Sequence, residues 1–449
     1  MSKYLRLEWL GVETRRVLHS KLFLGGALSL LIQLQFQIVR LLSGIILARA
    51  LGPVRLGIYT FTMAVVTLVQ IIPAYGLDGT VIRYSSEYRT KESWGLLRGL
   101  WRTALTVSVA YGLLAAAAVI GIRSVAYLKA GAAFSPDVLA MTCVVMLCMP
   151  TMTYLSAALR SANPGVLGQL PQFAIQPLVF LFLMIVAMTY ERAVISPGLA
   201  VLLQGSAAGV TVVVAAIWLH KNRPIAALST KPQRDMNRWL RSASSFCLLG
   251  GLELINTQTD VLMLGTLGSA HDTGIFRVAA NGANLLGLSV AAVNLYIGPK
   301  IPELYARGDT MRLQKLLSYC ARGAFGASLL AASLFLFLGT DLLRLIFGVA
   351  FIGAFWPLMI LCVGQLSSVG AGFGGLLLSM TGHERDAAII AGVAAACNIV
   401  LNACLVPRFG ALGCAFASAT TMLMWKTILF IRAKGKTGLN VSIFASRAA

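Results

Sequence analysis

The chain has 449 residues, of which 58% are hydrophobic and 12% are charged, and its formal net charge is +21. Its mean hydropathy is +0.80. A water-soluble protein of this length needs a larger charged fraction to cover its surface, so a soluble globular fold is excluded. Apolar stretches long enough to cross a bilayer core of about 30 Å recur along the chain. The sequence therefore predicts an all-α polytopic membrane protein.

The N-terminal 26 residues are basic and contain two glutamates, but they lack an apolar core with a small-residue cleavage site. We expect a cytoplasmic or interfacial segment there, not a removable signal peptide. The eight cysteines lie in apolar stretches without a CxxC pair, and the four histidines are scattered. Neither a disulfide framework nor a metal site is expected from this pattern.

Hydropathy predicts twelve transmembrane helices in two pseudo-symmetric six-helix lobes, separated by a basic linker. The expected spans are 27–48, 56–77, 100–122, 138–160, 166–189, 196–219, 241–266, 273–298, 316–338, 350–379, 387–406 and 410–431. The expected domains are a basic segment 1–26, an N-terminal lobe 27–220, a linker 221–240, a C-terminal lobe 241–433 and a cytoplasmic tail 434–449. An even number of spans in each half predicts a parallel repeat.

The distribution of Lys and Arg predicts the orientation of the chain. With the N-terminus in the cytoplasm, most of the 37 basic residues fall on inner segments, and the positive-inside rule then places both termini in the cytoplasm. An anionic inner leaflet accounts for the basic charge. A nucleic-acid partner is not expected, because no soluble basic domain with interleaved aromatic residues is present.

A short motif occurs at the same place in both halves. Residues 47–61 read LARALGPVRLGIYTF, and residues 264–276 read LGTLGSAHDTGIF. Each lies in the expected outer turn between the first and second spans of its half. Glycine and proline favour a tight hairpin there, with the aromatic side chain near the level of the headgroups.

Charged and amide residues lie inside several expected spans, where a charge costs on the order of 2.5–3.5 kcal/mol. Such side chains should face a partner or a watery cavity. Spacings of three and four residues place Gln33, Gln37 and Arg40 on one face of the first span. The other residues singled out are Glu253 and Asp260 in the seventh span and Arg277, Asn281 and Asn284 in the eighth.

Two roles are expected for these residues. Guanidinium groups suit phosphate, so we expect an anionic headgroup to be bound by Arg40, Arg277 and Arg49, together with Gln33, Gln37, Asn281 and Asn284. Glu253 and Asp260 are expected to bind a coupling cation, H⁺ or Na⁺, or to lock the halves together. Ion pairs Asp260–Arg277 and Arg40–Glu253 are the structural alternatives, and Asn398 and Asn402 are expected to make interhelical hydrogen bonds.

Motifs for soluble-enzyme chemistry are missing from the sequence. It contains no GxxxxGK[ST], HExxH or GxSxG pattern and no long outer loop for a catalytic pair. The pattern favours a carrier over an enzyme, with no cofactor beyond the coupling ion.

Five stretches carry a family resemblance over nearly the whole chain. They are ARALGPVRLGIYTF at 48–61, GLDGTVIRYSSEY at 76–88, TDVLMLGTLGSAHDTGIFRVAANGANLL at 259–286, PKIPELYARGD at 299–309 and NIVLNACLVPRFGALGCAFASA at 398–419. Together they resemble the polysaccharide-transporter branch, the Wzx-type repeat-unit flippases, of the multidrug/oligosaccharidyl-lipid/polysaccharide exporter superfamily.

The resemblance implies a V-shaped pair of lobes around a central cavity lined by spans 1, 2, 7 and 8, working by alternating access. The implied cargo is an undecaprenyl-diphosphate-linked oligosaccharide, moved from the cytoplasmic to the outer leaflet of the bacterial inner membrane for O-antigen, exopolysaccharide or capsule assembly. Other polysaccharide-assembly membrane proteins are the implied partners. The alternatives are a multidrug cation antiporter of the same superfamily and a membrane-embedded glycan ligase or polymerase.

Overall fold

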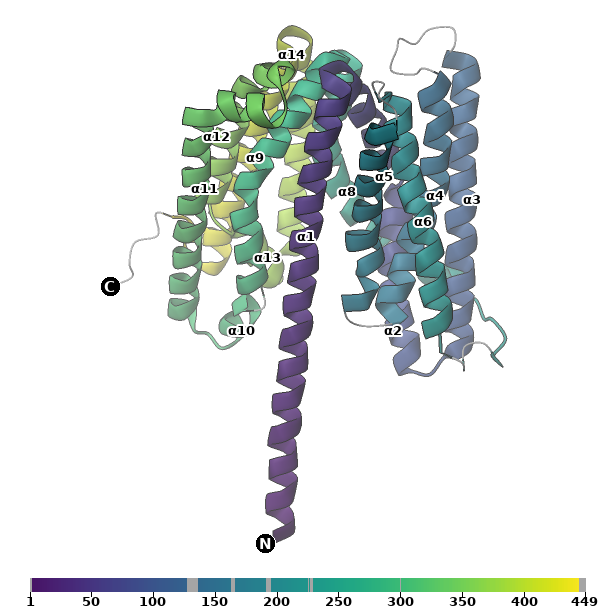
Figure 1. Ribbon diagram of the computed structural model, residues 1–449. Helices are drawn as coiled ribbons and strands as arrows, with labels where there is room; N and C mark the ends of the chain where they lie inside the picture. Colours follow the sequence, from purple (N-terminus) through teal and green to yellow (C-terminus); the bar gives the residue numbers. More distant parts are fainter. Residues whose placement is uncertain are drawn as a thin grey trace. The chain divides into compact units, whose positions relative to one another are not determined.

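The computed structural model describes residues 2–126, 136–162, 166–190, 195–224, 226, 229–298 and 300–443 (Figure 1). Within these ranges some side chains are not described, among them those of residues 2–27 and of Glu253. Every regular element in the described ranges is helical. The main helices are α1 (Ser2–Val69), α2 (Asp78–Thr90), α3 (Trp94–Ala126), α4 (Pro136–Ala162), α5 (Gln176–Tyr190), α6 (Pro197–Asn222), α8 (Met236–Leu267), α9 (Ala270–Ile297), α10 (Lys300–Ala306), α11 (Thr310–Ile346), α12 (Phe355–Gly370), α13 (Gly374–Met380) and α14 (Glu384–Thr437).

Two of the long helices are each interrupted by a glycine. Gly52 in α1 has a φ of 69° and precedes Pro53, and Gly410 in α14 has a φ of 52° and follows Pro407. Glycine adopts positive φ at little cost, and proline removes a backbone donor, so each position breaks the hydrogen-bond ladder. Gly52 falls in the turn that the sequence predicts between the first two spans, and Gly410 is the first residue of the expected span 410–431, directly after the predicted turn.

Nine helices in the described part of the chain are long and apolar enough to cross a membrane, with α1 and α14 each counted once. The prediction of an all-α membrane protein is therefore confirmed. The count of twelve spans is not confirmed and stays a prediction.

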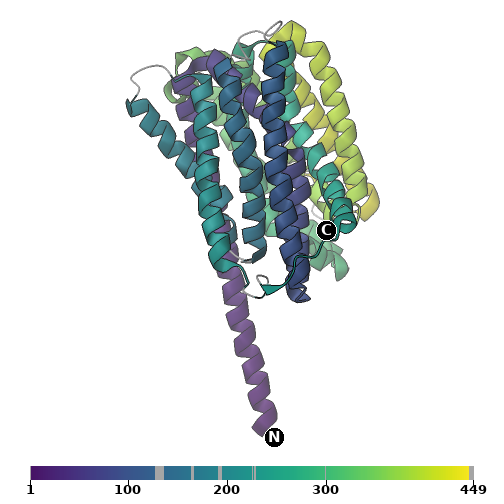
Figure 2. The same ribbon diagram turned by 90° about the vertical axis from the view of Figure 1, so that its right-hand side faces the viewer.

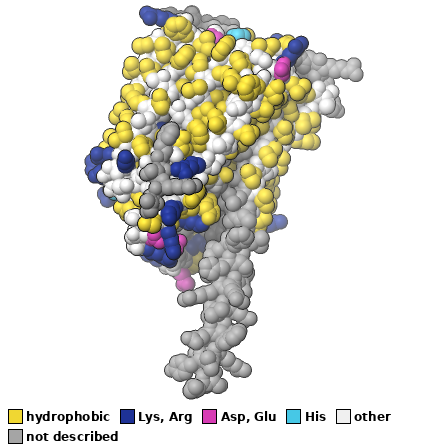
Figure 3. Space-filling view, turned by 90° about the vertical axis from the view of Figure 1, so that its left-hand side faces the viewer, with side chains coloured by type: hydrophobic (Ala, Val, Ile, Leu, Met, Phe, Trp, Pro, Cys, Tyr) yellow, Lys and Arg dark blue, Asp and Glu magenta, His cyan; other side chains and the backbone are white. Residues whose placement is uncertain are grey.

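The surface supports the same conclusion. Figure 3 shows hydrophobic side chains over most of the described part of one face, with most of its Lys and Arg side chains in the lower half. On α11, Leu330 is 74% exposed and Phe337 is 79% exposed. Contiguous apolar exposure of this kind is rare on soluble monomers, whereas it costs nothing against lipid.

The chain forms two compact units. Unit 1 consists of Met1–Gly44, Gln70–Ala193 and Gly198–Cys247, and unit 2 of Ile45–Val69, Val194–Pro197 and Leu248–Ala449. Helices α1 and α8 therefore each contribute residues to both units. The lobe boundaries expected from the sequence stay a prediction.

Unit 1 is built around an apolar core shared by α2, α3, α4 and α6. Its buried residues include Val81, Ala104, Tyr154, Ala158 and Ala215. Small alanines at these positions let the helices approach closely, which is the main source of packing energy between helices in lipid.

The linker and the first turns of α8 are fastened to α2 and α3 of unit 1. The backbone N–H of Gln233 donates to the Gly95 carbonyl at 2.9 Å. A Cβ on Gly99 would lie 1.6 Å from the Gln233 carbonyl oxygen, so only glycine permits this approach. The linker is therefore packed directly against α3 of unit 1.

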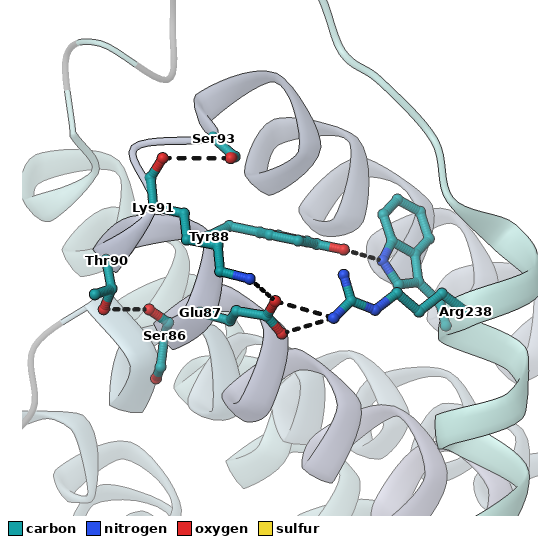
Figure 4. A network of polar contacts seen from close by, with 8 residues as sticks. Ser86, Glu87, Tyr88, Thr90, Lys91, Ser93 and Arg238 are labelled. Atoms are coloured by element: carbon teal, nitrogen blue, oxygen red, sulfur yellow. Dashed lines mark hydrogen bonds and ion pairs between the residues drawn. The ribbon is translucent and has the colours of Figure 1, made fainter.

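A polar network continues this attachment on α8 (Figure 4). The indole N–H of Trp239 donates to the Tyr88 hydroxyl at 3.0 Å. Glu87 accepts from Lys91 at 2.7 Å and from Arg238 at 2.9 and 3.1 Å. The Arg238 guanidinium also lies 4.9 Å from the centre of the Tyr84 ring, within the range of a cation–π contact.

The Glu87 ion pairs predict a pH-dependent contribution to stability. Hydrogen bonds from Lys91 and Arg238 lower the pKa of Glu87 from its ordinary value of 4.5. The contribution is therefore fully present above that value and is lost as the pH falls through the lowered folded-state pKa. We expect the difference in melting temperature between wild type and Glu87→Gln to be constant above about pH 5 and to shrink below about pH 4.5.

Thermal unfolding of the two purified proteins from pH 3 to pH 8, a range of about five units around the ordinary carboxyl pKa, measures this difference. In an Arg238→Gln and Lys91→Gln background the pH dependence of the difference should disappear. A wild-type advantage that grows toward acid pH would contradict the ion-pair explanation.

Unit 2 contains its own core, in which α10, α11, α13 and the end of α14 meet. Ile301, Leu313, Leu377 and Val441 are fully buried there. The Asn440 backbone N–H donates to the Gln314 side chain at 2.7 Å. These contacts anchor residues 438–443 on α11.

The two copies of the repeated motif contact each other inside unit 2. Gly57 and Gly274 are the glycines of the GIY and GIF sequences. A Cβ on Gly57 would lie 1.7 Å from the Ala270 carbonyl oxygen, and a Cβ on Gly274 would lie 2.0 Å from that of Pro53. Pro53 and Ala270 each lie four residues before the glycine of their own helix, so the contact is reciprocal. The helical segment 53–69 is thereby packed against the first turns of α9.

Candidate functional site

Unit 2 contains a cavity of about 850 Å³, which we call the unit 2 cavity. It lies between α8, α9, α12, α13 and α14. Its charged, amide and hydroxyl lining residues are Asn256, Thr257, Asp260, Arg277, Asn284, Asn294, Gln365, Ser379, Glu384, Asn398, Ser418, Thr421 and Lys426. Polar groups inside a membrane protein are expensive and gather where a substrate or ion passes. The unit 2 cavity is therefore the candidate functional site.

Asp260 is the centre of a hydrogen-bonded cluster between α8 and α14. One carboxylate oxygen, Oδ1, accepts from the side-chain amides of Asn402 at 2.9 Å and Asn398 at 3.2 Å. The other, Oδ2, accepts from the Ser418 hydroxyl at 2.7 Å. Asn398 and Asn402 are buried, and both make the interhelical hydrogen bonds expected of them.

One acceptor in this cluster has no partner in the described part of the structure. The Oδ1 atom of Asn402 is buried and receives no hydrogen bond there. An unsatisfied buried acceptor costs about 1–3 kcal/mol. It lies on a side chain whose amide N–H donates to Asp260, so the carboxylate itself is surrounded by two amide N–H donors and one hydroxyl donor. The Asp260 carboxylate is the group of this cluster that could take up a proton or a hard cation.

The cationic groups of the cavity come from two helices. Arg277 on α9 is partly buried and lines the cavity together with Lys426 on α14. The Lys426 ammonium lies 4.7 Å from the centre of the Trp425 ring, which also lines the cavity. The lining thus combines two cations with the carboxylates of Asp260 and Glu384.

The structure brings some of the sequence-predicted residues together in this cavity. Asp260, Arg277 and Asn284 line it. The hydrogen bonds to the Asp260 carboxylate come from the neutral side chains of α14. Asn281 is partly buried on α9 and is not among the residues lining the cavity.

Arg49 has a different environment within unit 2. Its Nε donates to the Ile346 carbonyl at 2.6 Å, and its Nη2 donates to the Leu345 carbonyl. These are terminal carbonyls of α11, which have no partner within their own helix. The observed contacts of Arg49 therefore cap a helix.

The remaining predicted residues lie outside unit 2 or outside the described side chains. Gln33, Gln37 and Arg40 are exposed on the part of α1 that belongs to unit 1. The Glu253 side chain is outside those described. The roles expected for these four residues stay predictions.

Sequence reasoning missed Ser418 and Lys426 as lining residues. A serine in an apolar helix normally bonds the carbonyl four residues earlier, as Ser418 also does with Cys414. Lys426 lies near the end of the expected span 410–431, where basic residues are common. Nothing in the sequence around Ser418 or Lys426 distinguishes a cavity-lining residue from a serine or lysine in these common roles.

Comparison with known proteins gives the same fold over almost the whole chain. A multidrug resistance MATE family transporter of the MOP superfamily, in an inward-facing conformation, has a TM-score of 0.76 at 14% identity, covering 92% of this chain and 98% of that one. The lipid II flippase MurJ, inward closed, has a TM-score of 0.69 at 14% identity, covering 91% and 87%. A MOP superfamily transporter from Pyrococcus furiosus has a TM-score of 0.61 at 12% identity, covering 92% and 94%.

Sequence comparison gives the family. None of the curated protein sequences matches the chain significantly. The family described as "Polysaccharide biosynthesis protein" matches residues 23–300, more than half of the chain. The chain therefore belongs to the polysaccharide biosynthesis protein family and has the fold of the MOP superfamily transporters.

Proposed function

We propose that the protein is a flippase that moves an undecaprenyl-diphosphate-linked oligosaccharide from the cytoplasmic to the outer leaflet of the bacterial inner membrane by alternating access. Both termini are cytoplasmic in this proposal, and the partners are other membrane proteins of polysaccharide assembly. The observation that carries it is the unit 2 cavity, a polar space with Arg277 and Lys426 in its lining, in a chain of a polysaccharide biosynthesis family.

The lining suits a lipid-linked sugar in two respects. The Arg277 guanidinium is a planar fork that matches phosphate oxygens. Asn284, Asn294 and Gln365 offer both donors and acceptors, which sugar hydroxyls require. The hydrocarbon tail of such a substrate stays in the bilayer, so the cavity needs to hold only the head.

The membrane potential favours the proposed direction. Moving one negative charge out of an inside-negative cell lowers the free energy by about 2.3 kcal/mol per 100 mV of membrane potential. A diphosphate carries about two such charges. Asp260 and its neighbours add a site where H⁺ or Na⁺ would bind and couple transport to an ion gradient. The role of Glu253 in this coupling, or in locking the halves, is part of the same proposal.

The test is transport of a fluorescent undecaprenyl-diphosphate oligosaccharide in liposomes that contain the purified protein. We expect Arg277→Gln to slow flipping roughly 10- to 100-fold, because a charge-assisted contact to phosphate is lost. Arg40→Gln is expected to act in the same direction. Arg307→Gln is the matched control, since it removes the same charge from an exposed pair between Arg307, directly after α10, and Glu303 on α10.

Equal flipping by wild type and Arg277→Gln would remove Arg277 from the headgroup site. The alternative function, multidrug cation antiport, gains support from the carboxylates of Asp260 and Glu384 in the cavity lining, since carboxylates attract cations. Wild-type liposomes that expel an organic cation but leave the glycolipid in place would establish this alternative. Cleavage or polymerisation of the glycolipid would instead indicate a ligase or polymerase.

A further inference from the structure

A second cavity lies in unit 1 and is not used by the proposed transport site. Its volume is about 270 Å³, and it is formed by α3, α4 and α6. These helices lie side by side in Figure 2 and share the unit 1 core. We call it the α3–α6 cavity. The sequence predicts that this end of unit 1 is cytoplasmic.

The charge of the α3–α6 cavity has one sign. Its polar lining contains Arg98, Arg102, His220 and Arg223, and no Asp or Glu is among the described residues that line it. Arg98 donates to the Thr230 carbonyl at 2.7 Å and so also holds the linker. Arg223 lies 3.2 Å from the His220 ring. The carboxylate of Glu87 on α2 does not line this cavity and is bound by Lys91 and Arg238.

The cavity wall is aromatic and fixed by hydrogen bonds. The Trp101 indole donates to the Ser85 hydroxyl at 2.9 Å, and the Tyr154 hydroxyl donates to the Trp101 carbonyl at 2.8 Å. These bonds connect α2, α3 and α4. The guanidinium groups are thus presented beside a rigid wall.

The apolar side of the cavity continues onto the exposed surface of the same helices. Leu105 lines the cavity and is 40% exposed. Exposed leucines follow on α3, including Leu113 and Leu114, and exposed Val213 and Ile217 lie on α6. A site that is cationic at one end and leads into a lipid-facing apolar surface matches an amphiphile with an anionic head, whereas free phosphate would use only the cationic end.

We infer that the α3–α6 cavity binds the phosphate headgroup of an anionic phospholipid of the cytoplasmic leaflet, with an acyl chain lying along α3 and α6. Basic pockets between transmembrane helices on the cytoplasmic side are the usual binding sites for such headgroups. Arg102 and Arg223 supply the phosphate contacts. Bound lipid would neutralise the cluster and hold α3 and α6 together at the end where the linker docks.

The experiment uses the tryptophan in the cavity wall. Full-length protein is placed in phosphatidylcholine vesicles that contain increasing amounts of brominated phosphatidylglycerol, and tryptophan fluorescence quenching is measured. The Trp101 contribution is obtained by subtracting the same measurement on Trp101→Phe. We expect Trp101 to be quenched at a phosphatidylglycerol fraction far below that needed for brominated phosphatidylcholine.

The variants test the cationic end. Each arginine removed should weaken the phosphatidylglycerol preference about fivefold, so Arg102→Gln with Arg223→Gln should weaken it about 25-fold. Arg307→Gln with Arg312→Gln is the matched control, because it removes two exposed cations of unit 2 and should leave the preference unchanged. Arg102→Gln alone, at an exposed position, keeps the test valid if the double variant fails to fold.

Three outcomes would overturn the inference. In the first, the double variant retains the wild-type preference. In the second, inorganic phosphate displaces the brominated lipid at the same concentration as a short-chain phosphatidylglycerol, which would assign the site to free phosphate. In the third, brominated phosphatidylglycerol does not quench Trp101 preferentially whereas undecaprenyl diphosphate changes the Trp101 fluorescence, which would make the cavity a second substrate site.

Discussion

Replacing Gly274 with alanine should destabilise the protein strongly, although alanine is the better helix former. The new Cβ would lie 2.0 Å from the Pro53 carbonyl oxygen, which belongs to backbone and has no rotamer to escape into. The segment 53–69 would have to move away from α9 and lose its packing. Overpacking of this kind costs about 1–3 kcal/mol or more, and we expect the melting temperature in detergent to fall accordingly.

Gly287→Ala on the same helix is the matched control. A Cβ at Gly287 has no neighbour within 4 Å among the described residues. The substitution should leave the melting temperature unchanged or raise it, since alanine is favoured over glycine in helices by about 1 kcal/mol. Gly57→Ala, on the opposite side of the contact, should behave as Gly274→Ala does. Equal melting temperatures for the Gly274 and Gly287 variants would mean that the glycine contact is not tight.

Replacing Asp260 with alanine should remove both the coupling of transport and part of the stability of unit 2. The amides of Asn398 and Asn402 and the hydroxyl of Ser418 lose their shared acceptor. The Asn402 amide keeps its bonds to Asn398 and the Ser418 hydroxyl keeps its bond to Cys414. The cost is therefore that of the Asn398 amide left without this acceptor, roughly 2 kcal/mol. Transport is measured with and without a Na⁺ or H⁺ gradient, and we expect the stimulation of transport by the gradient to disappear.

Asp260→Asn separates the two effects. An asparagine keeps an acceptor oxygen for the α14 side chains but carries no charge. Its melting temperature should stay close to that of the wild type, whereas gradient stimulation should still be lost. Asp341→Asn, an exposed position on α11, controls for loss of a carboxylate in general. Full stimulation in Asp260→Asn would show that the cluster only holds helices together.

The fold was largely predictable, because a membrane restricts the options. Composition and hydropathy alone predict helices that satisfy their own backbone groups. The repeated LG and GI-aromatic motif also predicts two equivalent turns. That Gly57 and Gly274 contact each other was not predictable, since hydropathy carries no information about which helix faces which.

The candidate site was predictable only for residues whose presence in lipid is costly. Asp260 and Arg277 stand out for that reason, and both line the unit 2 cavity. Arg49 stands out by the same criterion of cost, but a buried or membrane-embedded guanidinium does not need an anionic ligand. Its hydrogen bonds go to the terminal carbonyls of α11. Ser418 shows the converse, since a hydroxyl that bonds its own helix is cheap to bury and gives no signal.

The contact between the two glycine motifs also imposes an order on biosynthesis. Segment 53–69 leaves the ribosome roughly 200 residues before α9 begins at Ala270, a delay of about 10–40 s at ordinary elongation rates. Throughout that interval the α9 residues that pack against Gly57 have not been synthesised, so segment 53–69 lies in the bilayer without its packing partner. Membrane insertion factors and quality-control proteases therefore encounter an incomplete unit 2 during the whole synthesis of residues 70–269.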